Sequence, residues 1–100
     1  MKQLRIYTIT DQAQATLYYE KHWQRHLISL PKYHIAVDGV TLEQPEDADA
    51  NCRVFALVHV EEGWSLEKQN DLYMESDDFK ADMAGFPMSA IVSVEQIACR

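Results

Sequence analysis

Two histidines four residues apart are the first feature of the sequence that could do chemistry. His22 and His26 share one face of any helix that contains them, because side chains at i and i+4 are neighbours on a helix surface. An imidazole titrates near neutral pH, so either histidine could act as a general acid or base. The alternative is that both are ordinary surface or cleft side chains without a chemical role.

The same spacing occurs in helical motifs that bind zinc. The motif HExxH places a glutamate directly after its first histidine, whereas residue 23 of this chain is tryptophan. A third ligand would have to be His34, His59 or Glu20. The two cysteines, Cys52 and Cys99, are too few and too far apart to form a zinc site of their own. We therefore expect neither a metal nor any other cofactor.

Other catalytic and nucleotide-binding motifs are missing. The chain has no phosphate-binding glycine loop, no GxSxG and no CxxC, so it offers no support for nucleotide binding or for serine or dithiol chemistry. Arg5 could bind a carboxylate or an oxyanion through its planar guanidinium. The interpretation we favour pairs Arg5 instead with Asp38 or Glu95 at an interface between two copies of the chain.

Length and composition limit the class of protein. One hundred residues fit a single domain, which we expect to span residues 1–100. Sixteen acidic and nine basic residues give a net charge of −7, which argues against nucleic acid and anionic membranes as partners. The N-terminal residues lack the apolar segment of a signal peptide, and no run approaches the ~18 apolar residues of a membrane-spanning helix. Two cysteines without a secretory signal are more often reduced, so we expect a cytoplasmic protein.

The hydrophobic pattern predicts four strands and two main helices. The strands are expected at residues 2–9, 33–42, 53–60 and 89–97. Helices are expected at residues 12–29 and 66–75, capped by Asp11 and Ser65, with Ser76 capping a further short turn. The acidic residues between positions 61 and 82 are interpreted as a solvated helix face. The order βαββαβ predicts an α+β, ferredoxin-like fold, a four-stranded antiparallel sheet with both helices on one face.

The same pattern assigns residues to the two faces of the sheet. A four-residue stripe of the first helix is expected to face the sheet: Ala15, Tyr19, Trp23 and Leu27. The strand residues expected to meet the helices are Ile35, Val37, Val54, Val58, Val92 and Val94. The opposite face is expected to carry Arg5, Tyr7, Ile9, His34, Val40, Phe55, Leu57, His59, Ile91 and Ile97. So much apolar surface predicts a homodimer formed through this open sheet face.

An aromatic pair, a histidine and a leucine–proline step follow one another in residues 18–33. They are Tyr18, Tyr19, His22, Leu30 and Pro31. With the βαββαβ order, this run resembles the dimeric α/β-barrel superfamily, and within it the EthD-like proteins most. Residues 65–86 are similar to the second helical segment of those proteins, which ends in an aspartate and a phenylalanine before the last strand. The NIPSNAP proteins and the cofactor-free monooxygenases share this architecture.

The resemblance implies a ligand cleft between the helices and the sheet. In that cleft Tyr19, Trp23 and Tyr73 would hold a small aromatic or polyketide-like molecule. His22 or His26 would move a proton without a cofactor, as expected of an isomerase, cyclase or monooxygenase. His22 is the first candidate, because the aromatic pair Tyr18–Tyr19 stands shortly before it, in the order that these proteins show. The alternative function is a non-catalytic dimeric protein with a binding or stress-related role.

Overall fold

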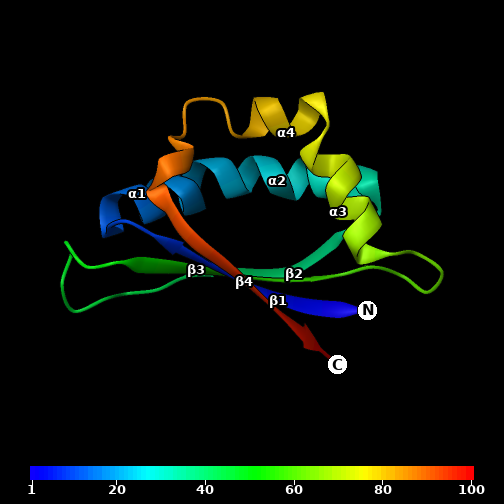
Figure 1. Cartoon of the computed structure of the whole chain (residues 1–100), viewed down its shortest axis with the longest axis horizontal. Helices are drawn as coiled ribbons and strands as arrows, with labels where there is room; N and C mark the ends of the chain where they lie inside the picture. Colours follow the sequence, from blue (N-terminus) through cyan, green and yellow to red (C-terminus); the bar gives the residue numbers. More distant parts are fainter.

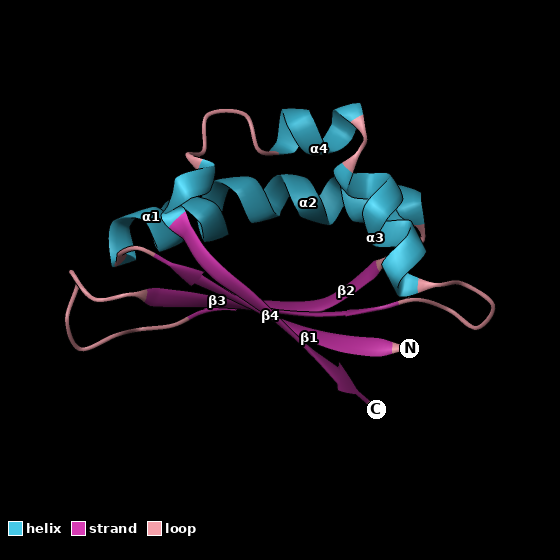
Figure 2. Ribbon diagram, in the orientation of Figure 1, coloured by secondary structure: helices cyan, strands magenta, loops and turns pink.

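The computed structural model describes residues 1–100 as two layers, with all helices on one face of a sheet (Figure 1). The strands are β1 (Lys2–Ile9), β2 (Ala36–Leu42), β3 (Cys52–His59) and β4 (Ile91–Cys99). All neighbouring strands are antiparallel, in the order β2-β3-β1-β4. The helices are α1 (Gln12–Leu17), α2 (Trp23–Ser29), α3 (Leu66–Met74) and α4 (Asp77–Asp82) (Figure 2). The predicted α+β, ferredoxin-like fold is confirmed.

The first helical segment begins where the sequence predicts, at Asp11, whose carboxylate accepts a hydrogen bond from the Gln14 amide at 2.8 Å. A π-helical turn at Tyr18–His22 joins α1 to α2, so the segment is continuous. The predicted stripe is only partly correct, since the side chain of Leu27 is 38% exposed. The four-residue stripe assumes an uninterrupted α-helix, whereas the π-helical turn between Ala15 and Leu27 changes the rotation per residue and so shifts which residues face the sheet.

The largest error of the sequence-based prediction concerns which residues of β1 face the helices. Along β1, Arg5 and Ile9 are buried under the helices, and Tyr7 packs against the same core. The paired residues of β3, Ala56 and Val54, are also fully buried. The prediction is wrong because β1 alternates between two sets of similar apolar character, so its own pattern does not say which set faces the helices.

The outer face, away from the helices, therefore carries the other set of strand residues. Its apolar members are Leu4, Ile6, Phe55, Leu57 and Ile97. The first four are partly buried within the single chain, while Ile97 is 47% exposed. This surface is smaller than the sequence predicts, because Arg5, Tyr7, Ile9, Val40 and Ile91 belong to the helix side.

Local irregularities in the strands explain why the sequence pattern places Val40 and Ile91 on the wrong face of the sheet. The chain continues past Pro31 as a 3-10 turn to Tyr33, and His34 then adopts a left-handed conformation with φ of 64°, so β2 begins only at Ala36. A bulge between Val37 and Gly39 puts residues 37 and 40 on the same face. A second irregularity, between residues 8 and 9 of β1, brings Ile91 opposite the buried residue 9.

The C-terminal half forms two short helices rather than one helix and a turn. Ser65 caps α3 by accepting from the Lys68 amide at 3.2 Å, and Ser76 caps α4 by accepting from the Phe79 amide at 3.1 Å, as the sequence predicts. The two helices meet at a sharp bend, and α4 packs on α2 (Figure 1). No helix of the chain has both the length and the apolar character needed to span a membrane.

Candidate functional site

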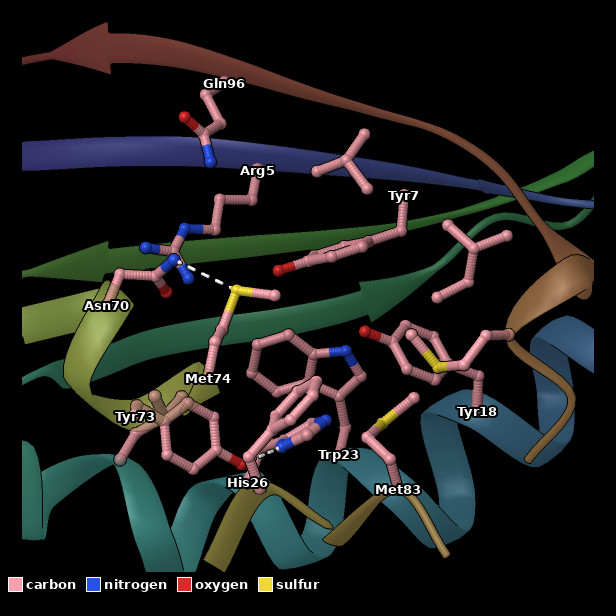
Figure 3. Close-up of a pocket in the computed structure, with 15 residues that line it drawn as sticks. Arg5, Tyr7, Tyr18, Trp23, His26, Asn70, Tyr73, Met74, Met83 and Gln96 are labelled. Atoms are coloured by element: carbon pink, nitrogen blue, oxygen red, sulfur yellow. Dashed lines mark hydrogen bonds between the residues drawn. The ribbon is translucent and has the colours of Figure 1, made fainter. Parts of the chain in front are cut away.

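A cavity of about 390 Å³ lies between the sheet and the helices, within the size range of small-molecule sites. Strands β1 and β4 form one wall, and α2, α3 and α4 form the other (Figure 3). The edge strand β4 is exposed along residues 92–98, so the cavity remains open on that side. Eleven of its 15 lining residues are hydrophobic. Its ring-bearing residues are Tyr7, Tyr18, Trp23, His26, Tyr73 and Phe79.

A chain of three polar side chains forms the helical wall. His26 of α2 lies with its Nδ1 atom 2.5 Å from the hydroxyl of Tyr73 on α3. That hydroxyl donates a hydrogen bond to Oδ2 of Asp82, the last residue of α4, at 2.5 Å. All three residues are buried, and the most exposed of them, Asp82, is 7% exposed, so the chain is shielded from water. Three helices thus meet at one buried network.

Burial decides the protonation of this network. The pKa of His26 falls from its usual 6.5 to about 4, because desolvation outweighs the attraction of the Asp82 carboxylate. Burial and the bond to Asp82 raise the pKa of Tyr73 far above its usual range, so the phenol keeps its proton. Since Tyr73 donates to Asp82, its oxygen accepts a hydrogen bond from the Nδ1–H of His26. The neutral imidazole then has its free lone pair on Nε2, which has no partner within the chain and is not fully buried.

The structure places His22 differently from the sequence-based expectation. Its ring is fully buried but does not line the cavity, and it packs against Phe86 with ring centroids 5.1 Å apart. Its Nδ1–H donates to the backbone carbonyl of Asp82 at 2.7 Å. Arg25 donates to the same carbonyl at 3.3 Å. His22 therefore joins the first helical segment to the end of α4, and only His26 of the two histidines reaches the cavity.

Of the three aromatic residues predicted to hold a ligand, only two line the cavity. Trp23 and Tyr73 line the cavity, whereas Tyr19 is half-buried beside it and does not. Its place is taken by Tyr18, which together with Tyr7 and Trp23 forms an edge-to-face cluster with centroids 5.5 to 6.3 Å apart. Burial raises the pKa of Tyr18 well above its usual value, so its hydroxyl stays neutral.

Arg5 and Asp82 are the residues whose place the sequence-based reasoning misses. Arg5 lines the cavity from β1 and is 4% exposed, although the pattern predicts it on the open face. On that outer face Asp38 pairs instead with His59, at 2.8 Å. Asp82 is expected on a solvated helix face but is 7% exposed. The sequence holds one signal for Asp82, because it follows the apolar Phe79 by three residues and so shares its helix face.

The chain offers no arrangement for a metal ion. No three His, Cys, Asp or Glu side chains come together closely enough to hold one. His26 and Asp82 are neighbours, with Nδ1 and Oδ2 3.8 Å apart, but the third member of their cluster is the protonated Tyr73. That no cofactor is needed stays a prediction.

Comparison with known proteins identifies the class of fold. No model of a protein family and no curated protein sequence matches the chain. Several solved structures are similar to the chain, and two of them are aligned with 99% of its length. One is the C-terminal domain of the MgtC protein from Mycobacterium tuberculosis, with 14% identity, 88% of that chain covered and a TM-score of 0.56. The other is a candidate antibiotic biosynthesis monooxygenase from Caulobacter crescentus, with 13% identity, 90% covered and a TM-score of 0.57.

At this level of identity the two likenesses establish the ferredoxin-like fold alone. They do not single out the EthD-like proteins among proteins of this fold. The chain is thus a small ferredoxin-like α+β protein with an aromatic cavity between its helices and its sheet.

Proposed function

We propose that the protein is a cofactor-independent enzyme that transfers a proton on a small aromatic or polyketide-like molecule bound in the cavity. The observation that carries the proposal is the neutral His26, held by Tyr73 and Asp82 at the wall of a mainly apolar cavity. A buried base beside an open, aromatic-lined cavity is the combination expected of a catalytic site. The similar solved structures support the ferredoxin-like fold that forms this cavity.

The geometry supports one proton-transfer step. A flat substrate would lie among the aromatic rings of the cavity, with an acidic C–H or O–H group at Nε2 of His26. Nε2 takes the proton, and the substrate keeps the electron pair as an enolate or phenolate. The resulting imidazolium is stabilised through its Nδ1–H by the Tyr73–Asp82 pair. Return of the proton to another substrate atom completes an isomerisation or accompanies a cyclisation.

The pKa of about 4 describes His26 in the empty site. Negative charge that develops on the substrate beside the ring raises this pKa during the transfer, because it favours the imidazolium. Water excluded from the cavity strengthens the same attraction. The step therefore depends on a substrate that fills the cavity.

Deuterium exchange tests the proposal for any substrate that carries an acidic C–H group. The protein is incubated in D2O with a panel of aryl 1,3-diketones and polyphenols, and loss of the acidic C–H signal is followed by NMR. We expect catalysed exchange of at least one compound, and its loss by about 100-fold or more in His26→Gln. Tyr19→Phe is the matched control, because it changes an aromatic residue of the same helical segment that lies outside the cavity.

The second candidate function is non-catalytic binding of the same class of molecule. The observation that favours it is that 11 of the 15 lining residues are hydrophobic and three of the rings already pack on one another. In that case a compound of the panel binds, no compound exchanges, and His26→Gln retains the affinity. Exchange that is catalysed equally by wild type and His26→Gln would contradict the catalytic proposal outright.

We also propose that a second copy of the chain covers the outer sheet face. The support is the apolar set on that face, which includes Phe55 and Leu57 in its centre and the 47% exposed Ile97 at its edge. Light scattering at micromolar concentration should give twice the monomer mass, and Leu57→Glu should reduce the mass to that of a monomer. A monomer mass for the wild type would refute the dimer and leave the cavity proposal unaffected.

A further inference from the structure

We propose that Arg5 binds a carboxylate of the cavity's ligand, so that the natural ligand is a flat, apolar molecule with an acidic group at one end. This inference rests on the proposed function in that it assigns a ligand class to the same cavity. The observation that carries it is a buried guanidinium without a counter-ion.

Arg5 lies in the middle of β1, and its side chain enters the space between the sheet and α3 (Figure 3). Its residue exposure is 4%. Its Nε donates a hydrogen bond to Oε1 of Gln3 at 2.9 Å, and its guanidinium also lies within hydrogen-bonding reach of the Tyr7 hydroxyl. None of the ion pairs in the chain includes it. The nearby phenol of Tyr7 is neutral, because burial raises its pKa more than the charge of Arg5 and the hydrogen bond with Arg5 lower it. The two terminal nitrogens of the guanidinium, with four N–H donors, therefore have no anionic partner.

Such an arrangement is unusual in a chain with a net charge of −7 and 16 acidic residues. A buried charge without a partner is destabilising, and buried cations in proteins are normally paired. Acidic groups do occur nearby, because Glu67 and Asp71 line a polar cavity that also contacts Arg5. Neither carboxylate forms an ion pair with Arg5. The chain thus keeps a cation at the cavity wall and supplies no anion for it.

Polar side chains around Arg5 form one end of the cavity. Gln96 lies opposite Arg5 on the neighbouring strand β4, and Asn70 faces it from α3. All three residues line both the apolar cavity and the adjoining polar cavity. Figure 3 shows the three polar groups together, with Met74 and Trp23 between them and His26 on the helical wall, and with Tyr7 to one side. A ligand with its ring among the aromatic residues would place an acidic group at this end.

The chemistry of the guanidinium indicates a carboxylate. Two parallel N–H donors match the two oxygens of a carboxylate, and this charged pairing is stronger than a hydrogen bond between neutral groups. The amides of Gln96 and Asn70 can donate to the remaining lone pairs. A ligand that lacks the acidic group would leave Arg5 without an anion after binding, so it should bind more weakly.

The test compares 2-naphthoate with the neutral 2-naphthalenemethanol, using isothermal titration calorimetry at neutral pH. Wild type should bind the carboxylate at least about tenfold more tightly than the alcohol, since a charged hydrogen bond of about 1.4 kcal/mol or more separates them. Arg5→Met should bind both compounds with equal affinity, close to that of the alcohol for wild type. Arg5→Lys, which keeps the charge without the planar fork, should retain part of the preference.

His26→Gln separates this inference from the proposed enzyme activity. It should keep the preference for naphthoate, because the substitution lies at the other end of the cavity, while it removes deuterium exchange. Far-UV circular dichroism checks that Arg5→Met is folded, and Arg5→Gln serves if it is not. Equal affinities in wild type, a preference that survives loss of Arg5, or no binding of either compound at millimolar concentration would each overturn the inference.

Discussion

The two ends of the cavity differ in how far the chain satisfies its own polar groups. At the helical end, His26 and Tyr73 are joined to Asp82 in an unbroken chain of hydrogen bonds. At the sheet end, Arg5 has only neutral partners, the side chains of Gln3 and Tyr7, and no anionic partner. The ionisable groups of the first end are linked to one another within the chain, although Nε2 of His26 and Nε1 of Trp23 have no partner, whereas the second end holds a cation without an anion. The difference implies that the helical end is positioned in advance, whereas the sheet end is stabilised only when something binds.

The largest expected effect is a loss of protein stability at acid pH, caused by protonation of His26 at the helical end of the cavity. Burial lowers the pKa of His26 from 6.5 to about 4, so the unfolded chain binds a proton that the folded protein rejects. The free energy of unfolding should therefore be highest above pH 6.5, where the imidazole is neutral in both states, and should fall as the pH falls towards 4. At roughly 1.4 kcal/mol per pKa unit, the expected loss is about 3 kcal/mol. Urea denaturation of wild type and His26→Gln across this range measures it. Equal pH dependence in the two proteins would show that His26 is not shielded.

Removing the carboxylate should weaken the same end at constant pH. Asp82→Ala leaves the buried hydroxyl of Tyr73 without its acceptor, and we expect a loss of about 2 kcal/mol in the free energy of unfolding. The backbone carbonyl of residue 82 remains, so the bond from His22 persists. Asp77→Ala, on the exposed start of α4, is the control and should change stability by less than about 0.5 kcal/mol. A loss of similar size in both variants would contradict the network.

His22 should behave as a structural residue rather than a ligand-binding one. His22→Ala removes a buried ring and its bond to the Asp82 carbonyl, so we expect the free energy of unfolding to fall by about 1–2 kcal/mol. The affinity for 2-naphthoate should stay within about twofold of wild type, because a difference below roughly 0.4 kcal/mol is expected for a residue outside the cavity. Loss of binding with unchanged stability would restore His22 as the catalytic candidate.

The smallest effect is expected at the sheet end, and with the opposite sign. Arg5→Met replaces an unpaired buried cation by an apolar side chain of similar length, so the free protein should gain about 1 kcal/mol in stability. Thermal denaturation without ligand measures the gain. A clear decrease in the melting temperature would mean that Arg5 is already paired in the free protein, and the contrast between the two ends would disappear.

Much of the fold could be predicted because its signals are local. Asp11, Ser65 and Ser76 mark helix starts through a side-chain oxygen and the amide three residues later, which is a contact within one turn. Alternation in residues 2–9 and 53–60 predicts strands for an equally local reason. Gly85 adopts a positive φ of 87° in the short connection between α4 and β4, a conformation that glycine adopts without steric cost.

The face that each strand presents is not a local property. Alternation divides the residues of β1 into two sets that point to opposite faces, but only the packing of the helices decides which set is buried. In addition, irregularities in the pairing of β2 and β4 change which residues of those strands face the helices. The pattern misplaces Arg5 for this reason. Arg5 is buried although charged residues are usually exposed, and the pattern of its neighbours in the sequence does not predict this burial.

The sequence by itself determined the order of elements, the pair of candidate histidines and the aromatic character of the cavity. Only the tertiary structure decided which histidine reaches the cavity, because that depends on how α4 lies on α2. His22 is bound by the backbone at the end of α4, while His26 meets Tyr73 and Asp82, 47 and 56 residues further along the chain. Contacts over such separations arise from packing of whole elements, which the spacing of residues within one helix does not specify.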